Sequence, residues 1–280
     1  DIDAIGLGLW TRPRLGTHAD LHEYSPREKE DVWRWRVFVA PYMAWQVRHF
    51  VRRANSVSST ATKFCEEYRR NFGVNPTLVV NAAPYADLAP SPMPATGEPI
   101  RVVHAGAGRA DRFLELLIEA VAALEGRYSL DMYLTENSPD YFQRLQESVA
   151  QIPNVRVLPA LPYQQLIPTL NRYDLGIHNL PPVNFNNRYA LPNKFFDFVQ
   201  ARIGMVVGPS PEMVSRLERY GLGRAAADFT AAALRAALEE TTPAEVAAWK
   251  QNAAACAREL SSENVVTLWK DAVEAIGQGR

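Results

Sequence analysis

The sequence has few cysteines, no excess of either charge and no long apolar run. Its two cysteines, Cys65 and Cys256, lie far apart without CxxC spacing, which argues against a disulfide framework and against a zinc site. A formal net charge of -1 gives no general attraction to nucleic acid. No stretch approaches the roughly 20 apolar residues that span a bilayer, and the first residues lack the layout of a signal peptide. We therefore expect a soluble, cytoplasmic protein with no metal site and no nucleic-acid partner.

What is present is enough apolar sequence for a substantial core. The chain has 280 residues, 47% of them hydrophobic, so it can form one large domain or two smaller ones. Prolines and small residues concentrate in residues 83–99, APYADLAPSPMPATGEP, which predicts a linker there.

After this linker, short apolar runs alternate with helical patterns. The expected strands are IRVVHAG, SLDMYL, VRVLPA, DLGIHN and GMVVGP, and the expected helices cover residues 112–124, 140–151, 163–173, 192–201 and 211–220. Strands that are apolar throughout and alternate with helices indicate a parallel sheet covered on both faces, so we predict an α/β fold with a Rossmann-like domain. Residues from Thr230 onward are typical of Ala-rich helix.

The region before the linker gives a thinner pattern. We expect a long helix over residues 27–53, kinked at Pro41, then a strand at NSVSS, a helix over residues 60–72 and a strand at TLVVNA. These strands are too few for a complete Rossmann-like domain. The long helix mixes tryptophan with arginine, which suits a membrane surface, but its apolar spacing favours burial against the domain. The spacing comes from Trp33, Val37, Met43, Val47 and Val51.

Ligands of an open parallel sheet bind beyond the carboxyl ends of its strands. The loop after the first strand is HAGAGRADRF, in which Gly106 and Gly108 permit close backbone approach and the following helix start favours phosphate. Arg109 and Arg112 add positive charge. The third glycine of the dinucleotide fingerprint is absent, so the motif leaves two alternatives: a phosphate site, or a tight turn with solvated arginines.

A second loop of this kind runs from Asn186 into LPNKFFDFVQARIGMVVGPSPEMVSRL. This segment resembles the PNK-containing motif of retaining, family-four-like glycosyltransferases of the GT-B fold. The pieces DLHEYSP, ANSVSSTATKFCEEYRRNFGVNPTLVVNAAP and VVHAGAGRADRFLELLIEAVAAL resemble other parts of the same family in the same order. The resemblance covers almost everything from Asp20 onward.

The resemblance implies roles for particular residues. Arg112 and Lys194 would contact the diphosphate or the sugar and act in catalysis, and Asp197 would accept hydrogen bonds from the ribose hydroxyls. The motif's first glutamate, which is associated with the transferred sugar, would fall at Tyr189, so contacts to that sugar and activity itself are open. Asn187 and its neighbours, residues 186–188, have the donors to replace it. The alternatives are a solvated Lys194–Asp197 pair and an ordinary asparagine turn.

Other candidates come from the rule that ligands lie at strand ends. Thr135 and Tyr163 follow the second and third expected strands and are candidates for contacting the nucleotide base. His104 and His178 are either ligands or structural histidines. His22, in DLHEYSP, is a candidate for catalysis or acceptor binding, or a polar residue at a strand end.

Together these observations predict a GT-B protein with an incomplete N-terminal Rossmann-like domain and linker (residues 1–97), a nucleotide-sugar-binding domain (98–262) and a helix that crosses back (263–280). We expect the missing N-terminal strands to have been omitted from this sequence rather than lost. The expected activity is metal-independent, retaining transfer from a nucleoside-diphosphate sugar to a glycan, lipid-linked or small-molecule hydroxyl acceptor, with no cofactor. Peripheral contact with the inner face of the membrane would suit a lipid-linked acceptor. The alternatives are a non-catalytic protein that binds a nucleotide sugar or a partner chain, and a dinucleotide oxidoreductase.

Overall fold

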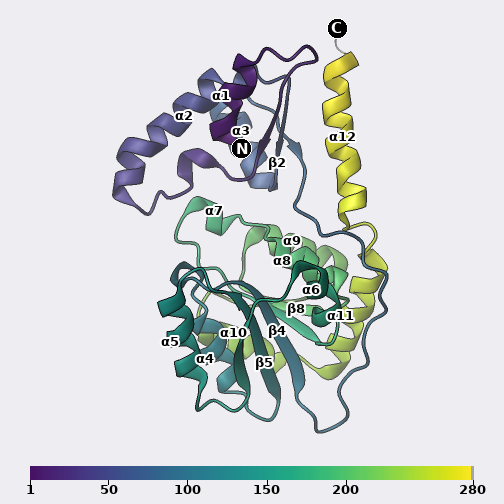
Figure 1. Cartoon of the computed structure of the whole chain (residues 1–280). Helices are drawn as coiled ribbons and strands as arrows, with labels where there is room; N and C mark the ends of the chain where they lie inside the picture. Colours follow the sequence, from purple (N-terminus) through teal and green to yellow (C-terminus); the bar gives the residue numbers. More distant parts are fainter. Residues whose placement is uncertain (279–280) are drawn as a thin grey trace. The chain divides into compact units, whose positions relative to one another are not determined.

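The computed structural model describes residues 1–278, which form two compact units (Figure 1). Unit 1 consists of Asp1–Ala82, Pro182–Leu191 and the residues from Ser262 onward, and unit 2 consists of Ala83–Pro181 and Pro192–Ser261. The linker expected at residues 83–99 thus falls within unit 2. The ten residues from Pro182 fall within unit 1, although they lie in the middle of the predicted nucleotide-sugar domain.

Unit 2 contains a parallel sheet of six strands in the order β6-β5-β4-β7-β8-β9. The order reverses direction between β4 and β7, which makes this pair the switch point of a doubly wound sheet. All five strands expected after the linker are present, and the short β9 was not expected. The strands are β4 (Ile100–Ala107), β5 (Tyr128–Thr135), β6 (Val155–Pro159), β7 (Leu175–His178), β8 (Gly204–Val207) and β9 (Gly223–Ala225).

Helices cover both faces of this sheet. Every residue of β7 and β8 is buried, as expected for strands that are apolar throughout. Helix α4 packs against α10, while α8 packs against α11 and α6. The helices of unit 2 are α4 (Glu115–Ala122), α5 (Pro139–Val149), α6 (Tyr163–Leu170), α8 (Asn193–Gln200), α9 (Pro211–Tyr220), α10 (Ala231–Glu240) and α11 (Pro243–Cys256).

Helix α8 is held in place by its aromatic side chains. Phe195, Phe196 and Phe198 are fully buried. The Phe198 ring lies so close to Gly176 of β7 that a Cβ at Gly176 would come within 2.5 Å of it. This close packing of helix on strand fixes α8 against the sheet and leaves Lys194 and Asp197 on the part of the helix that is only partly buried.

The helix predicted over residues 112–124 begins later than expected, at Glu115. Residues Ala110–Arg112 form a 3₁₀ turn, and Phe113 adopts a left-handed conformation with φ 52°. A left-handed residue cannot continue a right-handed helix, so Arg112 lies at the end of the turn and not in the first turn of α4.

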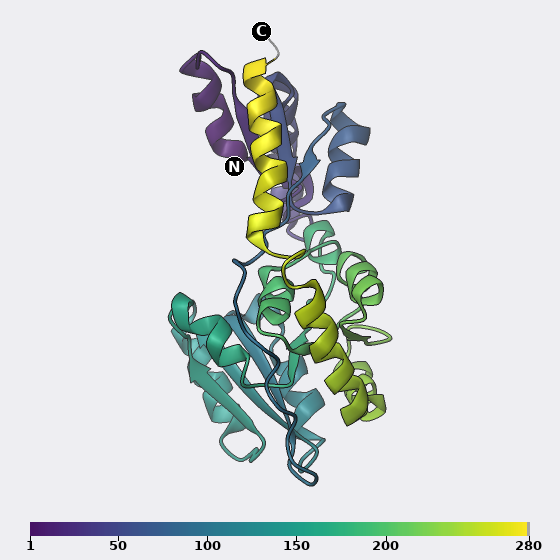
Figure 2. The same ribbon diagram turned by 90° about the vertical axis from the view of Figure 1, so that its right-hand side faces the viewer.

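Unit 1 is built on a parallel sheet of three strands, β1 (His18–Leu21), β2 (Ser56–Ser59) and β3 (Thr77–Leu78). Helix α12 (Ser262–Gln278) packs against β2 and β3 (Figure 2). Phe185 of the short helix α7 is buried in the core of this unit beside Tyr24 and Phe64. The remaining helices are α1 (Ile2–Trp10), α2 (Ala40–His49), α3 (Thr62–Phe72) and α7 (Phe185–Arg188).

The long helix predicted over residues 27–53 is shorter than expected. Residues 33–49 form one helical run, in which a π-helical turn (Trp35–Val39) leads directly into α2, and separate 3₁₀ turns lie before it (Ser25–Arg27) and after it (Val51–Arg53). Pro41 occupies the first turn of α2, where a residue without an N–H is tolerated. Val47 and Val51 are buried, but Trp33 and Val37 are 58% and 52% exposed, so the expected burial holds only for the second half. Within residues 1–278, none of the helices combines the length and apolar character needed to cross a bilayer.

Candidate functional site

The switch point between β4 and β7 brings together residues from three segments of unit 2. His104 and Gly106 lie at the carboxyl end of β4, and His178 ends β7. Lys194 extends from the first turn of α8 so that its Nζ lies where a side chain at Gly106 would place its Cβ. Any residue with a Cβ would clash with the Lys194 ammonium. This explains the glycine at residue 106, whose backbone conformation is that of an ordinary strand.

Two further charged groups surround Lys194. The Arg112 guanidinium and the Asp197 carboxylate both interact electrostatically with its ammonium group. Burial, together with the positive charge of Arg112, lowers the pKa of Lys194 to about 8. Burial raises the pKa of Asp197 to about 6, although the Lys194 charge opposes this. Within residues 1–278, neither Lys194 nor Asp197 has a side-chain hydrogen bond or an ion pair, so both are available to a ligand.

The two histidines beside Lys194 are neutral. His104 Nδ1 lies 2.9 Å from the Ile177 carbonyl oxygen and must donate to it, so Nε2 is left as an acceptor. Burial, with a contribution from the Lys194 charge, lowers the pKa of His104 to about 3, and the same causes hold the pKa of His178 well below its usual value. The rings stack with centroids 6.0 Å apart. They therefore provide neutral hydrogen-bonding groups and no further positive charge.

Unsatisfied polar atoms mark the end of β7. His178 Nδ1 and the Asn179 Oδ1 are buried and have no hydrogen-bond partner among the described residues. Leaving such an atom unpaired costs about 1–3 kcal/mol, so these two atoms indicate a place where a ligand or water is needed. His178 was a candidate from the sequence, whereas Asn179 was not. Its signal was an asparagine directly after an apolar strand.

Of the other residues predicted to contact the nucleotide, two lie at the ends of β4 and β5 and two are exposed side chains. Gly108 lies close to the Thr135 carbonyl and donates its N–H to it at 2.9 Å, which joins the ends of β4 and β5. The Thr135 hydroxyl is bonded to Asn137. Arg109 is exposed and paired with Asp111 at 2.7 Å, and its role at a phosphate stays a prediction. Tyr163 is 69% exposed at the start of α6, and among the described residues no contact joins it to Arg112, Lys194 or Asp197.

Two predicted residues belong to unit 1. His22 Nε2 lies 3.1 Å from Asp20 Oδ2, and both side chains are exposed. Asn187 donates its backbone N–H to the Asn184 side chain, which caps α7. Tyr189, at the position of the motif's first glutamate, packs its ring against Phe185 with centroids 4.9 Å apart. For His22 and Asn187, a role in catalysis or sugar binding stays a prediction.

The contact between Lys194 and Gly106 can be tested by Gly106→Ala. We expect the unfolding temperature to change little, because the strand conformation accepts alanine and the group displaced is the end of a flexible side chain. Lys194 Nζ must move away, so any function of its ammonium group should weaken. Thermal unfolding and the ligand titrations proposed below measure the two effects separately. Gly126→Ala, a substitution in an open turn with φ 79°, is the control for a glycine whose replacement strains the backbone without touching the site.

No protein-family model matches the sequence, and no curated protein matches it. Solved structures do match in fold. The Anabaena protein HepE in complex with UDP-glucose has a TM-score of 0.72 at 15% identity, covering 99% of this chain and 77% of that chain. A glycosyltransferase from Rickettsia africae has a TM-score of 0.66 at 12% identity, covering 85% of this chain and 68% of that one. WaaG, a glycosyltransferase involved in lipopolysaccharide biosynthesis, has a TM-score of 0.62 at 14% identity, covering 89% and 70%.

The chain has the GT-B fold. This confirms the predicted α/β class, with a Rossmann-like sheet in unit 2 and a smaller parallel sheet in unit 1. Arg112, Lys194 and Asp197 lie at the switch between β4 and β7, which is where an open parallel sheet binds its ligand. Among residues 1–278, no group of three or more His, Cys, Asp or Glu side chains is placed to hold a metal ion.

Proposed function

We propose that this protein is a glycosyltransferase that binds a nucleoside-diphosphate sugar at the carboxyl edge of the six-stranded sheet and transfers the sugar to a hydroxyl acceptor. The observation that carries the proposal is the Lys194 ammonium, which lies over Gly106 beside Arg112 and has no hydrogen-bond partner among residues 1–278. A desolvated cation at the switch point of a parallel sheet suits a diphosphate. The structures of similar fold include HepE bound to UDP and glucose, which supports this class of donor.

In the proposed reaction, the acceptor oxygen bonds to the anomeric carbon while the bond from that carbon to the diphosphate oxygen breaks. The electron pair leaves with the nucleoside diphosphate, whose terminal phosphate gains negative charge as the bond breaks and then takes up the proton of the acceptor hydroxyl. Lys194 and Arg112 would stabilise that charge, and two fixed cations can do so without a metal ion. We propose that the anomeric configuration is retained, as the resemblance implies.

Asp197 would hold the ribose. Its carboxylate has four acceptor positions and no protein donor among residues 1–278, so it can accept hydrogen bonds from two adjacent hydroxyls. His178 Nδ1 would form a hydrogen bond with the phosphate or the sugar, and Asn179 Oδ1 would accept one from a sugar hydroxyl, which would satisfy the two unpaired atoms.

One observation favours a second candidate, a protein that binds a nucleotide sugar without transferring it. Tyr189 replaces the motif's first glutamate with a side chain that packs on Phe185, so that position offers no carboxylate to the donor sugar. Incubating the full chain with UDP-glucose and following UDP release separates the two candidates. Turnover in transfer or hydrolysis supports the enzyme, whereas UDP binding without any turnover supports the binding protein.

The pH dependence of UDP binding tests the proposed site. Lys194 must be charged to bind a diphosphate, and its pKa of about 8 means that affinity should fall about tenfold per pH unit above pH 8. Asp197 must be ionised to accept from the ribose, so affinity should also fall below about pH 6. Calorimetric titration of UDP from pH 5 to pH 10 should therefore give a maximum between these limits.

Lys194→Arg is the matched control for the alkaline limit, because arginine stays charged over this range. The variant should lose the decline above pH 8 even if its affinity is lower throughout. The acidic limit is less diagnostic, since a terminal phosphate also titrates near pH 6. Affinity that stays constant up to pH 10 in the unsubstituted chain would show that Lys194 does not bind the diphosphate.

A further inference from the structure

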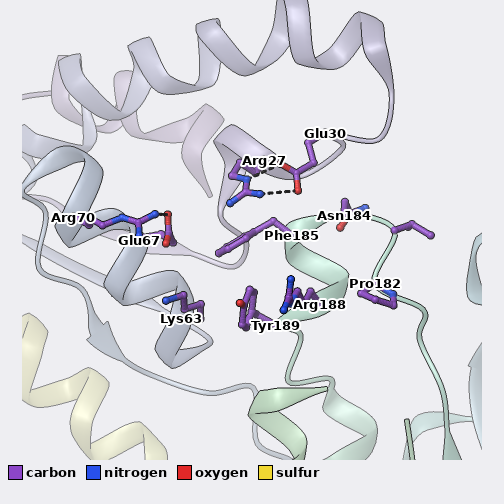
Figure 3. A pocket seen from close by; sticks show the side chains of 11 residues that line it. Arg27, Glu30, Lys63, Glu67, Arg70, Pro182, Asn184, Phe185, Arg188 and Tyr189 are labelled. Atoms are coloured by element: carbon purple, nitrogen blue, oxygen red, sulfur yellow. Dashed lines mark hydrogen bonds and ion pairs between the residues drawn. The ribbon is translucent and has the colours of Figure 1, made fainter. Parts of the chain in front are cut away.

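Unit 1 contains a pocket that the proposed donor site does not use. Its cavity of about 360 Å³ lies within the range of small-molecule sites. Three segments line it: the 3₁₀ turn that ends at Arg27, helix α3 with Lys63 and Glu67, and the segment around α7 with Arg188 and Tyr189 (Figure 3). All three belong to unit 1.

The lining is predominantly basic. Four side chains are cationic, Arg27, Lys63, Arg70 and Arg188, and two are acidic. Lys63 also pairs with Glu66, outside the lining, at 2.9 Å, so there is one more positive than negative charge. Lys63 and Arg188 lie on either side of the Tyr189 ring, 5.9 Å and 5.5 Å from its centroid. Their approach from α3 and from α7 places two cations around one aromatic ring, where an anionic group can contact both.

Glu67 gives the pocket a second character. This residue is only 3% exposed, yet it lines the cavity. Arg70 and Asn71 donate to it at 2.7 Å and 2.9 Å, and both bonds go to Oε2. Oε1 accepts no hydrogen bond from the described residues, so it can accept one from a ligand in the cavity. A simple inorganic anion at high pH has no hydrogen to give, whereas a ligand with hydroxyl groups does.

The pocket is also rigidly framed. Phe185 belongs to the core of unit 1 and lies beneath the Arg27 guanidinium, whose centre is 4.4 Å from the ring centroid. Arg27 in turn forms a two-pronged ion pair with Glu30, at 2.5 Å and 3.1 Å. These contacts preorganise one wall of the pocket, which reduces the entropy lost when a ligand binds.

We infer that this pocket binds a sugar that carries an anionic substituent, with Lys63 and Arg188 at the anion and Glu67 Oε1 accepting from a sugar hydroxyl. The binding itself does not depend on the proposed transfer reaction. Only the role of the bound sugar rests on the proposed function: if the protein transfers sugars, the acceptor is an anionic sugar or a glycan that ends in one.

The test uses the full chain and four probes: glucose 6-phosphate, glucuronate, glucose and inorganic phosphate, titrated by calorimetry at pH 7. We expect glucose 6-phosphate or glucuronate to bind at least about tenfold more tightly than glucose and than phosphate, because only these carry both the charge and the sugar hydroxyls. Which of the two binds better identifies phosphate or carboxylate as the substituent. Equal binding of phosphate and glucose 6-phosphate would refute recognition of the sugar.

Substitutions locate the binding. Lys63→Gln and Arg188→Gln should each weaken the anionic sugar by about tenfold, the loss expected for one charge-assisted hydrogen bond. Arg69→Gln is the matched control, since Arg69 lies on the same helix and bonds to Asn75 outside the pocket lining. Unchanged affinity in both pocket variants, or an equal loss in the control, would place the binding elsewhere.

Lys194→Met keeps this inference separate from the proposed function. That variant should bind UDP about ten- to hundredfold more weakly and the anionic sugar unchanged, while Lys63→Gln should bind the anionic sugar about tenfold more weakly and UDP unchanged. A chain that binds no UDP but does bind the anionic sugar would refute the proposed donor site alone. A chain that binds UDP and none of the four probes would refute the pocket alone.

Discussion

Replacing Lys194 with methionine should weaken UDP binding by about ten- to a hundredfold while leaving the fold intact. The lost contact is a charge-assisted hydrogen bond to a diphosphate, worth about 1.5–3 kcal/mol. Methionine has a similar length and is apolar, so it can occupy the space over Gly106. Because burial and Arg112 already hold the pKa of Lys194 at about 8, the folded state disfavours this charge, and its removal should not lower stability.

Calorimetric titration measures the affinity, and thermal unfolding without ligand measures the stability. Arg219→Met is the control, because it removes an exposed cation from α9 of the same unit and should leave UDP binding unchanged. If Lys194→Met binds UDP as tightly as the unsubstituted chain, the assignment of the diphosphate to this residue is wrong. If the variant unfolds far below the unsubstituted chain, Lys194 is a structural residue, contrary to our interpretation.

The largest expected loss of stability comes from Asp174→Ala. Asp174 is fully buried just before β7, where Oδ2 accepts from the Arg101 backbone N–H and Nε, and Oδ1 accepts from Lys250 Nζ at 2.8 Å. Lys250 is itself only 1% exposed. Removing the carboxylate leaves a buried ammonium without its counter-ion, which costs about 3–5 kcal/mol. Urea unfolding followed by circular dichroism measures this change in the free energy of unfolding.

A second substitution tests the stated cause. Asp174→Ala combined with Lys250→Met removes both charges and should recover much of the lost stability, since an apolar replacement of a buried ion pair is often neutral. The effect should also depend on pH. Burial alone would raise the pKa of Asp174, but the hydrogen bonds from Arg101 and Lys250 outweigh it and leave the pKa below its ordinary value. The stability that Asp174 contributes is therefore present at neutral pH and is lost as the pH falls through that lowered pKa. A double variant that is no more stable than Asp174→Ala would contradict the counter-ion explanation.

The sheet of unit 2 could be predicted because each strand is marked in the sequence by its own run of apolar residues. The run GMVV of β8 is apolar throughout, and only a strand covered on both faces buries it fully. Helix α8 was also predictable, since the proline at its start and its buried phenylalanines follow helical spacing. In residues 27–53 the same reasoning failed. There the apolar spacing continued through a segment that the fold leaves exposed at Trp33 and Val37, so periodicity alone did not indicate where the helix begins.

The candidate site could be predicted by residue type but not by contact. Lys194, Arg112 and Asp197 were found from their motif positions, and the structure places them within electrostatic reach of one another. That Lys194 reaches over Gly106 depends on the pairing of β4 with β7 and on the packing of α8, which join residues about 90 positions apart. The unpaired atom of Asn179 has the same origin, because only the assembled sheet buries it.

The way in which the chain alternates between its two units limits how the gene can be divided. It changes unit after Ala82, Pro181, Leu191 and Ser261. A cut at the proline-rich segment would yield an amino-terminal fragment that lacks Phe185, whose ring fills the core beside Tyr24 and Phe64. Such a fragment would have a cavity in its core. We therefore expect the two units to fold only when they are co-expressed, or when residues Pro182–Leu191 are joined to the rest of unit 1. For the same reason, recombination between homologous genes should give a folded protein only where the segment equivalent to Pro182–Leu191 still packs into the core of unit 1.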